Sequence, residues 1–182
     1  RIQPARTRLR RGKPRSDFTR HEDIERRLEW QLQAERILSD LAGRLATARD
    51  LKKSFATSLQ KIRNFLQCDR VWMNVSSDPS ETGRLTMAVR RSDLPGGEGT
   101  LDRKAVGWLF TRVSRGRAIH CRDISRLPAA AAAERIACQA MGTRAFYVEP
   151  LLIRGQYRGV LSLCQADKPR AWSREERGFV HT

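Results

Sequence analysis

Hydrophobic residues in the first third of this chain recur at spacings of three and four, with arginine and glutamate between them. Over residues 21–48 this spacing predicts an amphipathic helix of about seven turns, with charged residues on the opposite side. The main apolar positions are Trp30, Ala34, Ile37, Leu41, Leu45 and Ala48, and Leu28, Leu32 and Leu38 widen the stripe.

A stripe of this width and length exceeds what one small domain covers, so we expect the helix to pack on a second copy of the chain. The prediction is a parallel homodimer whose interface contains Trp30, Ile37, Leu41 and Leu45. Residues 1–20 have no periodic apolar positions, which predicts a disordered basic arm or linker before the helix.

After residue 48 the pattern changes to short helices and strands. Asp50 is a predicted N-cap for a helix from Leu51 to Leu66, and Ser173 for a last helix with Glu176 in its first turn. Between them the pattern predicts strands at 69–75 and 84–91, a helix at 103–115, a strand at 118–124 and a helix at 129–141.

The longest apolar runs, 145–153 and 157–163, flank a short polar turn and predict a β-hairpin. Gly155 supplies the positive φ that a tight turn needs, and Pro150 belongs at a bulge or on an unpaired side of its strand. Gly159 lets another backbone or a large ring approach closely. Because the runs barely alternate, we expect this hairpin at the centre of a sheet covered on both faces.

The order of these elements indicates an α+β domain with a central antiparallel sheet of five or six strands and helices on both faces. We therefore divide the chain into a basic arm (1–20), the amphipathic helix (21–48) and a domain (49–182) that ends within its last helix. The sequence starts without methionine and stops in a helical pattern, so we expect a piece of a longer protein.

The formal net charge of +16 comes from an excess of arginine, and eight Lys or Arg with one Asp lie in residues 1–20. Such charge suits nucleic acid or anionic lipid, but no recognised nucleic-acid motif accompanies it, which favours a general arginine bias. A nucleic-acid-binding protein using the basic arm remains an alternative.

The four cysteines are widely spaced, which favours reduced thiols in a cytoplasmic protein. No apolar run approaches the ~20 residues of a membrane helix.

The sequence lacks the residue groupings that catalysis requires. His120 and Cys121 are the adjacent His/Cys pair, but neighbours on a strand point to opposite faces and cannot act as a dyad. Residues 94–100 are glycine-rich without the lysine of a phosphate-binding loop. We therefore expect no enzymatic activity in this part of the protein.

Several motifs together resemble the GAF domain, a sensory module of bacterial signalling proteins, over about residues 34–182. They are Cys68-Asp-Arg-Val-Trp-Met73, Gly107-Trp-Leu109 with Gly116-Arg-Ala-Ile-His-Cys-Arg-Asp123, Leu127-Pro128 through Gly142, Glu149-Pro-Leu151 with Gly155 and Gly159-Val-Leu-Ser162, and Arg170-Ala-Trp-Ser-Arg-Glu-Glu176. Residues 21–45, beginning with Asp23-Ile-Glu-Arg-Arg27, resemble the linker helix that often follows a PAS domain in two-component kinases.

The resemblance implies a cavity between the sheet and the helices on one face. Its expected lining, an aromatic and basic set suited to a planar or anionic ligand, is Trp72, Trp108, His120, Arg122, Phe146 and Tyr147. Ordinary core packing is the alternative role for the aromatic residues. The family includes cyclic-nucleotide, haem and bilin binders. No bilin-attachment context or cyclic-nucleotide signature is readable, a haem-ligand role for His120 stays open, and the cofactor is unknown.

The resulting hypothesis is a non-catalytic sensory domain of a signalling protein, a sensor histidine kinase, that senses a small ligand or partner. The signal would reach an output domain in the same chain through dimeric helices, as a population shift between two helix packings. The alternatives are the regulatory domain of a transcription activator or of a cyclic-dinucleotide enzyme, and a scaffold that only dimerises.

Overall fold

The long N-terminal helix predicted from the apolar stripe is present in the computed structural model, which describes residues 15–75, 85–95 and 106–182. It is α1 (Arg15–Ala46), so it begins before the expected residue 21, and the last six residues assigned to a disordered arm are helical. Residues 1–14 lie outside the described ranges. The chain divides into two compact units, Arg1–Asp40 and Leu41–Thr182.

The second helix has the predicted ends. It is α2 (Leu51–Leu66), and the Asp50 side chain accepts a hydrogen bond from the Lys53 amide at 3.0 Å. Gln67 ends the helix in the left-handed conformation, with φ 48°. Leu59 and Leu66, each 2% exposed, face the sheet side of this amphipathic helix, where α2 packs against the first two strands.

In the described part of the chain, five antiparallel strands form one sheet in the order β2-β1-β5-β4-β3. They are β1 (Arg70–Val75), β2 (Leu85–Arg90), β3 (Ile119–Cys121), β4 (Ala145–Ile153) and β5 (Gln156–Gln165). The predicted hairpin is β4–β5, and its second strand occupies the centre of the sheet, as expected. Arg154 and Gly155 form the two-residue turn with φ 53° and 74°, the combination of a type I′ turn.

Two local predictions for the hairpin are also confirmed. The pairing register shifts between Leu151 and Leu152, one residue beyond Pro150, so the proline lies close to a β-bulge. Gly159 takes a φ of 154°, and a Cβ on this residue would lie 1.9 Å from the backbone oxygen of Asn74. The close approach expected at Gly159 is therefore made by the backbone of β1.

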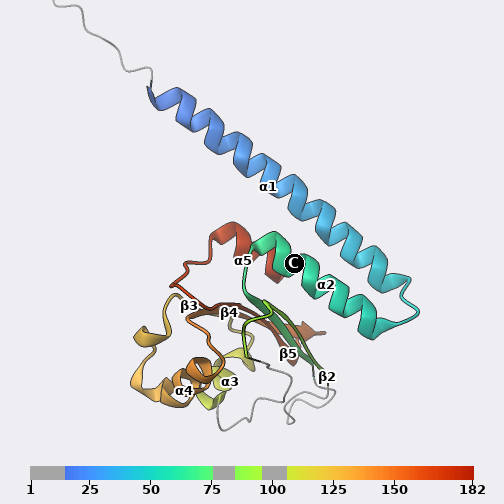
Figure 1. Cartoon of the computed structure of the whole chain (residues 1–182). Coiled ribbons are helices and arrows are strands. Elements are labelled where there is room, and N and C mark those ends of the chain that lie inside the picture. The colour runs from blue at the N-terminus through green and yellow to red at the C-terminus, as the bar shows by residue number, and fades with distance from the viewer. Residues whose placement is uncertain (1–14, 76–84, 96–105) are drawn as a thin grey trace, which may run out of the picture. The chain divides into compact units, whose positions relative to one another are not determined.

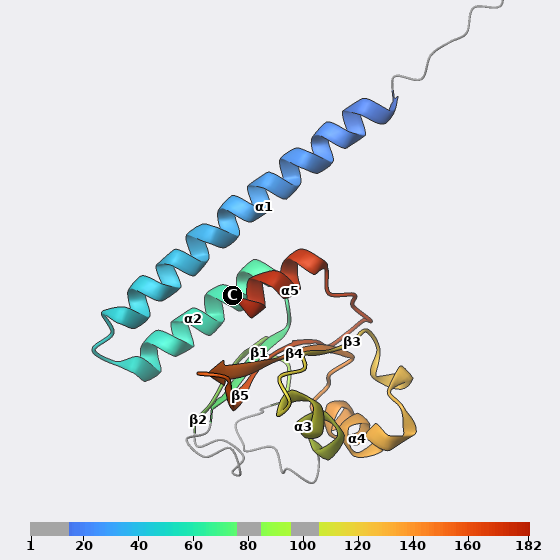
Figure 2. The same cartoon turned by 180° about the vertical axis from the view of Figure 1, so that it is seen from behind.

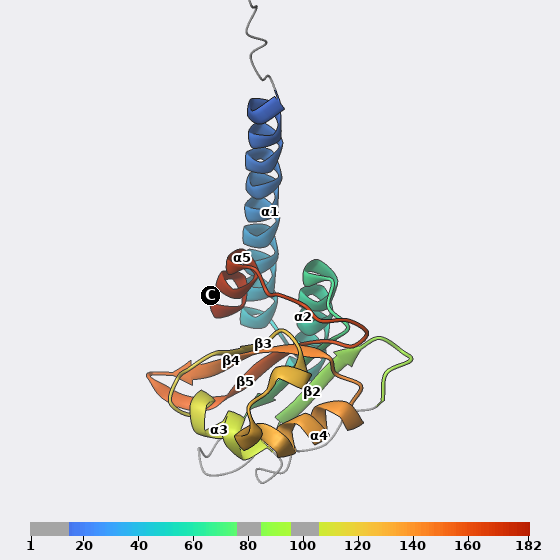
Figure 3. The ribbon, with the colours of Figure 1, turned by 90° about the vertical axis from the view of Figure 1, so that its left-hand side faces the viewer.

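Helices cover both faces of the sheet, as Figure 3 shows. On one side lie α2 and α5 (Arg174–His181), as Figure 1 shows. These two helices meet through the rings of Phe65 and Phe179, whose centres are 4.9 Å apart. On the other side lie α3 (Gly107–Val113) and α4 (Ala132–Ala140), visible from behind in Figure 2. The α+β fold with a five-stranded sheet and helices on both faces is thus confirmed.

The element boundaries differ from the predictions in the segment between β2 and β4. The helix expected at 103–115 is described from Gly107 to Val113, and residues 103–105 lie outside the described ranges. The strand expected at 118–124 has three residues and is followed by a 3-10 turn, Ile124–Arg126. The last helix has the predicted cap, since Ser173 and Glu176 form a reciprocal capping box. Within the described ranges, no helix has the length and apolar character to cross a bilayer.

Candidate functional site

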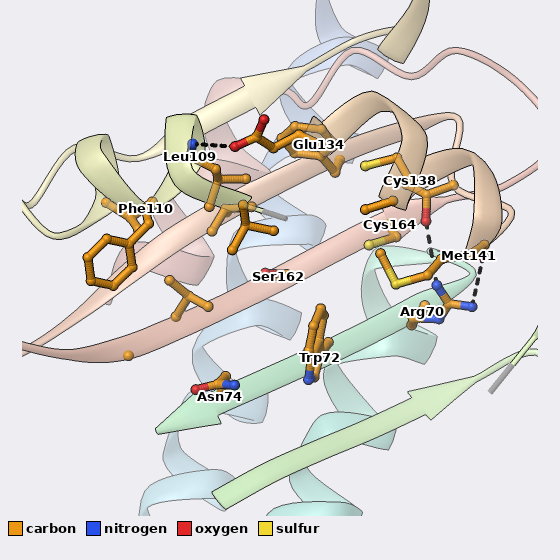
Figure 4. Close-up of a pocket in the computed structure, with 18 of the residues that line it drawn as sticks. Arg70, Trp72, Asn74, Leu109, Phe110, Glu134, Cys138, Met141, Ser162 and Cys164 are labelled. Atoms are coloured by element: carbon orange, nitrogen blue, oxygen red, sulfur yellow. Dashed lines mark hydrogen bonds between the residues drawn. The ribbon is translucent and has the colours of Figure 1, made fainter. Parts of the chain in front are cut away.

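A pocket of about 100 Å³ lies between the sheet and the helices α3 and α4 (Figure 4). The strand β1 lines it with Arg70, Trp72 and Asn74, since residues two apart on a strand point to the same face. The intervening Val71 and Met73 face the opposite side, toward α2, and are buried as their predicted apolar face requires. The neighbouring strand β5 continues the pocket wall with Ser162 and Cys164, the cross-strand partners of Trp72 and Arg70.

Arg70 is the most unusual residue in the pocket wall, because its charged side chain is only 2% exposed. Its guanidinium donates to the backbone oxygens of Pro95 (2.9 Å) and Met141 (3.1 Å) and contacts the Thr143 hydroxyl at 3.5 Å. These acceptors are all neutral, and the Nε atom has no hydrogen-bond partner in the part of the chain described. Arg70 therefore joins three segments and places a buried positive charge beside the pocket.

Glu134 occupies the helix side of the same pocket and is also 2% exposed. Its carboxylate accepts a hydrogen bond from the Leu109 amide at 3.0 Å, near the start of α3. The N-terminal amides of a helix have no partners within it, so a carboxylate there stabilises the helix end. Glu134 thus holds α3 against α4, and its negative charge lies on the wall facing β1 (Figure 4).

Two further polar side chains of the pocket come from β1. The indole Nε1 of Trp72 is buried and has no hydrogen-bond partner among the described residues. The Asn74 amide donates to the Thr86 hydroxyl at 3.2 Å, which fixes its orientation across β1 and β2. Most of the remaining wall is apolar, including Leu109, Phe110, Val113, Phe146, Val148 and Val160.

Cys138 and Cys164 add two sulfur atoms to the pocket wall (Figure 4). Burial raises the pKa of the Cys138 thiol to about 12 and that of Cys164 to about 11. Both thiols are therefore protonated at neutral pH, and the thiolate is the nucleophilic form. The arrangement favours a binding role for the pocket over covalent catalysis by these cysteines.

The structure brings two of the six residues predicted for a ligand site to this pocket. Trp72 and Phe146 line it, one from β1 and one from β4. Trp108 packs beside the pocket's core cluster instead, with the Arg112 guanidinium 3.9 Å from its ring centre. Trp108 therefore lies beside the pocket without lining it.

The other three predicted residues, His120, Arg122 and Tyr147, lie elsewhere. His120 pairs with Tyr147 in the β3–β4 register, and both alternate with the pocket-facing Phe146, so both belong to the opposite face. His120 is exposed there, on an edge strand, while Tyr147 is buried. Arg122 follows the end of β3 with an exposed side chain, and its backbone oxygen accepts from the Arg170 amide at 3.0 Å.

Sequence reasoning missed the two buried charges, Arg70 and Glu134. One signal was available for Arg70, because it stands within the otherwise apolar strand 70–73 on the face opposite Val71 and Met73. Glu134 had a weaker signal, a single acid within an alanine-rich helix. Neither residue was singled out from the sequence, because arginine and glutamate usually lie exposed.

A second polar cluster lies on the opposite face of β4. The Tyr147 hydroxyl donates to Glu149, which is 5% exposed, and Glu149 contacts His181 Nδ1 of α5 at 2.7 Å. Burial and the hydrogen bond to Glu149 raise the pKa of Tyr147, so its hydroxyl stays protonated and donates. The strand that carries pocket residues on one face therefore holds the C-terminal helix on the other.

Comparison with known proteins supports the fold assignment. Over 155 residues, 80% of this chain, the sequence is 24% identical to the circadian input-output histidine kinase CikA of Thermosynechococcus vestitus. The match covers 21% of the length of that kinase, so the chain corresponds to about a fifth of it.

Solved structures give the same result. The blue-light absorbing PixJ GAF domain of Thermosynechococcus elongatus is 25% identical with a TM-score of 0.58, covering 71% of this chain and 77% of that one. The phycocyanobilin-bound GAF domain of a cyanobacterial phytochrome is 14% identical with a TM-score of 0.66, covering 80% and 86%. The GAF domain family itself matches residues 50–182, most of the chain. With the antiparallel sheet and its helices, this match shows that the chain belongs to the GAF domain family.

Proposed function

We propose that this GAF domain is a non-catalytic sensor that binds a small molecule in the pocket between the sheet and α3/α4. The observation that carries the proposal is the pocket itself, a space of about 100 Å³ with a mainly apolar wall and buried polar groups on two sides. This combination is typical of ligand sites, which are mostly apolar with a few polar groups that orient the ligand. The volume suits a ligand of about one ring, since an engineered cavity of about 150 Å³ holds benzene.

The proposed output is a change in the flanking helices of a longer signalling protein, a sensor histidine kinase. The similarity to CikA, which extends over 21% of that kinase, supports this output. Within the domain, β4 connects the pocket to α5, because Phe146 and Val148 line the pocket and Glu149 contacts His181. A ligand that favours one position of β4 would shift the population of α5 positions, and this is the proposed mechanism.

Filling the pocket tests this function. In Ala137→Phe a ring occupies the pocket wall, because Ala137 lines it from α4, whereas Ala133 is exposed on the same helix. In a thermal-shift screen of small fragments, we expect hits to raise the melting temperature of the parent and of Ala133→Phe by roughly 5–10 °C near saturation. The same hits should leave Ala137→Phe unchanged. A library without hits, or hits that stabilise Ala137→Phe equally, would favour the scaffold alternative.

The dimer remains part of the proposal and rests on the exposed apolar residues of α1. Ile24, Leu28 and Leu32 are 57%, 56% and 49% exposed and lie four residues apart on the helix. Of the residues first expected in the interface, Trp30, Ile37 and Leu45 are half-buried and Leu41 is 8% exposed in the single chain. We therefore place the centre of a homodimer interface at Ile24, Leu28 and Leu32, with Trp30 and Ile37 beside it.

Sedimentation at about 0.3 M salt, where the net charge of +16 is screened, tests the dimer. We expect the parent to associate at micromolar concentrations and Leu28→Glu/Leu32→Glu to be monomeric, because burying each leucine contributes roughly 1.5–3 kcal/mol. The control is Gln31→Glu/Gln33→Glu, which adds the same charge at exposed positions of the same helix. A monomeric parent at high micromolar concentration would contradict a dimer formed by this segment alone.

A further inference from the structure

Two buried hydrogen-bond donors on the pocket wall have no partner among the described residues. They are Arg70 Nε and Trp72 Nε1, and both residues line the pocket from the same face of β1. Native proteins pair the great majority of their buried polar groups, so a pair of unpartnered donors in one place calls for a partner outside the protein chain. Residues two apart on a strand have Cα atoms about 6.5 Å apart, so the two side chains are neighbours on this wall.

Unpartnered donors also occur away from the pocket, at Trp172 Nε1 and Arg135 Nε. These two side chains do not line the pocket, so an unpartnered nitrogen is not by itself a sign of a ligand. Arg70 and Trp72 differ because they combine such nitrogens with a position on the pocket wall. Trp172 is therefore a matched comparison for Trp72, with the same unpartnered indole in a different place.

The charge of Arg70 narrows the chemistry of the missing partner. A buried guanidinium is normally paired with an anion, whereas the hydrogen-bond partners of Arg70 among the described residues are two carbonyl oxygens and a hydroxyl. Glu134 supplies a negative charge on the helix side of the pocket and makes no ion pair with Arg70 within 4.0 Å. An anionic ligand group is thus repelled from the α3/α4 side and attracted to the β1 side.

We propose that the pocket binds a small carboxylic acid with an apolar body, a deduction that rests on the proposed function of the pocket as a ligand site. The carboxylate lies toward Arg70 and Trp72, where its two oxygens accept from the guanidinium and the indole. The apolar body, one ring or a short branched chain, packs against Leu109, Phe110 and Val160. Both donor nitrogens are covered by protein, so binding requires the two side chains to turn until their N–H groups face the carboxylate.

Calorimetric titration with benzoate, benzamide and toluene tests this assignment. Benzamide keeps the size and shape of benzoate without its charge, and toluene keeps only the ring. We expect benzoate to bind the parent at least roughly tenfold more tightly than either neutral probe, because hydrogen bonds to a charged group are the stronger ones. Ala137→Phe should remove benzoate binding and Ala133→Phe should not.

Comparing Trp72→Phe with Trp172→Phe distinguishes the loss of a specific hydrogen-bond donor from a general loss of packing. Trp72→Phe removes the indole N–H at the pocket and should weaken benzoate binding several-fold while leaving toluene binding nearly unchanged. Trp172→Phe removes the other unpartnered indole N–H and should change neither benzoate binding nor toluene binding. Arg70→Lys keeps the charge but loses the Nε donor and the planar fork, so it should also weaken benzoate. Since Arg70 joins three segments and its variant can lose the fold, the decision rests on the tryptophan pair.

The outcomes distinguish this inference from the proposed function. Neutral probes that bind as tightly as benzoate, with binding removed by Ala137→Phe, would overturn the carboxylate assignment and leave the ligand pocket intact. Equal weakening of benzoate by Trp72→Phe and Trp172→Phe would also overturn it. Absence of benzoate binding at millimolar concentration contradicts the acid assignment, and the fragment screen then decides independently whether the pocket binds any ligand.

Discussion

Replacing Leu163 with aspartate is expected to unfold most of the domain at 25 °C. Leu163 is completely buried in the central strand β5, where it pairs with Val71 on one side and Tyr147 on the other. Losing its packing costs about 2–5 kcal/mol, and the unpaired carboxylate adds its own desolvation penalty or takes up a proton. The sum is comparable to the whole stability of a typical domain, about 5–15 kcal/mol.

Urea unfolding followed by circular dichroism measures this effect. The matched control is Leu152→Asp in the same hairpin, since Leu152 is 48% exposed and the new carboxylate stays in water. We expect the control to lie within about 1 kcal/mol of the parent. If Leu163→Asp unfolds at the same urea concentration as the control, β5 is not the centre of the sheet.

Replacing Gly159 with alanine is the second substitution with a large expected effect. The added Cβ would lie 1.9 Å from the backbone oxygen of Asn74 and 2.9 Å from the Cα of Val75, and the φ of 154° disfavours any side chain. The neighbouring atoms belong to the backbone of β1, so no flexible side chain can move aside. The two central strands must separate locally, at a cost of about 3–5 kcal/mol.

Thermal unfolding provides the measurement, and the expected loss corresponds to a fall in melting temperature of roughly 10–15 °C. Gly178→Ala serves as the control, because Gly178 lies in α5 and its Cβ would meet nothing within 4 Å. Alanine is the better helix former, so this control should gain about 0.5–1 kcal/mol. A melting temperature for Gly159→Ala equal to that of the parent would show that β1 does not approach β5 as closely as described.

Local sequence signals determined the elements themselves. Asp50 and Ser173 begin their helices as predicted, since capping depends on a side chain and backbone amides only two or three residues away. Gly155 and the apolar runs beside it identified the β4–β5 hairpin for the same reason, because turn and strands are adjacent in sequence. The same local information was weaker between β2 and β4, where a strand of three residues and the 3-10 turns Ile124–Arg126 and Ala129–Ala131 leave little periodicity to read.

The chain's own sequence therefore determined the α+β class, the amphipathic helix, the central hairpin and the motifs of the family. The tertiary structure alone decided the composition of the pocket. Arg70 donates hydrogen bonds to Pro95 and Met141, which are 25 and 71 residues away in the sequence. A periodic pattern of apolar residues cannot predict contacts across such separations. His120 and Tyr147 lie outside the expected site because residue type does not specify which face of a strand a side chain occupies. The pairing register specifies that face, and the register depends on which strands pair across long separations in the sequence.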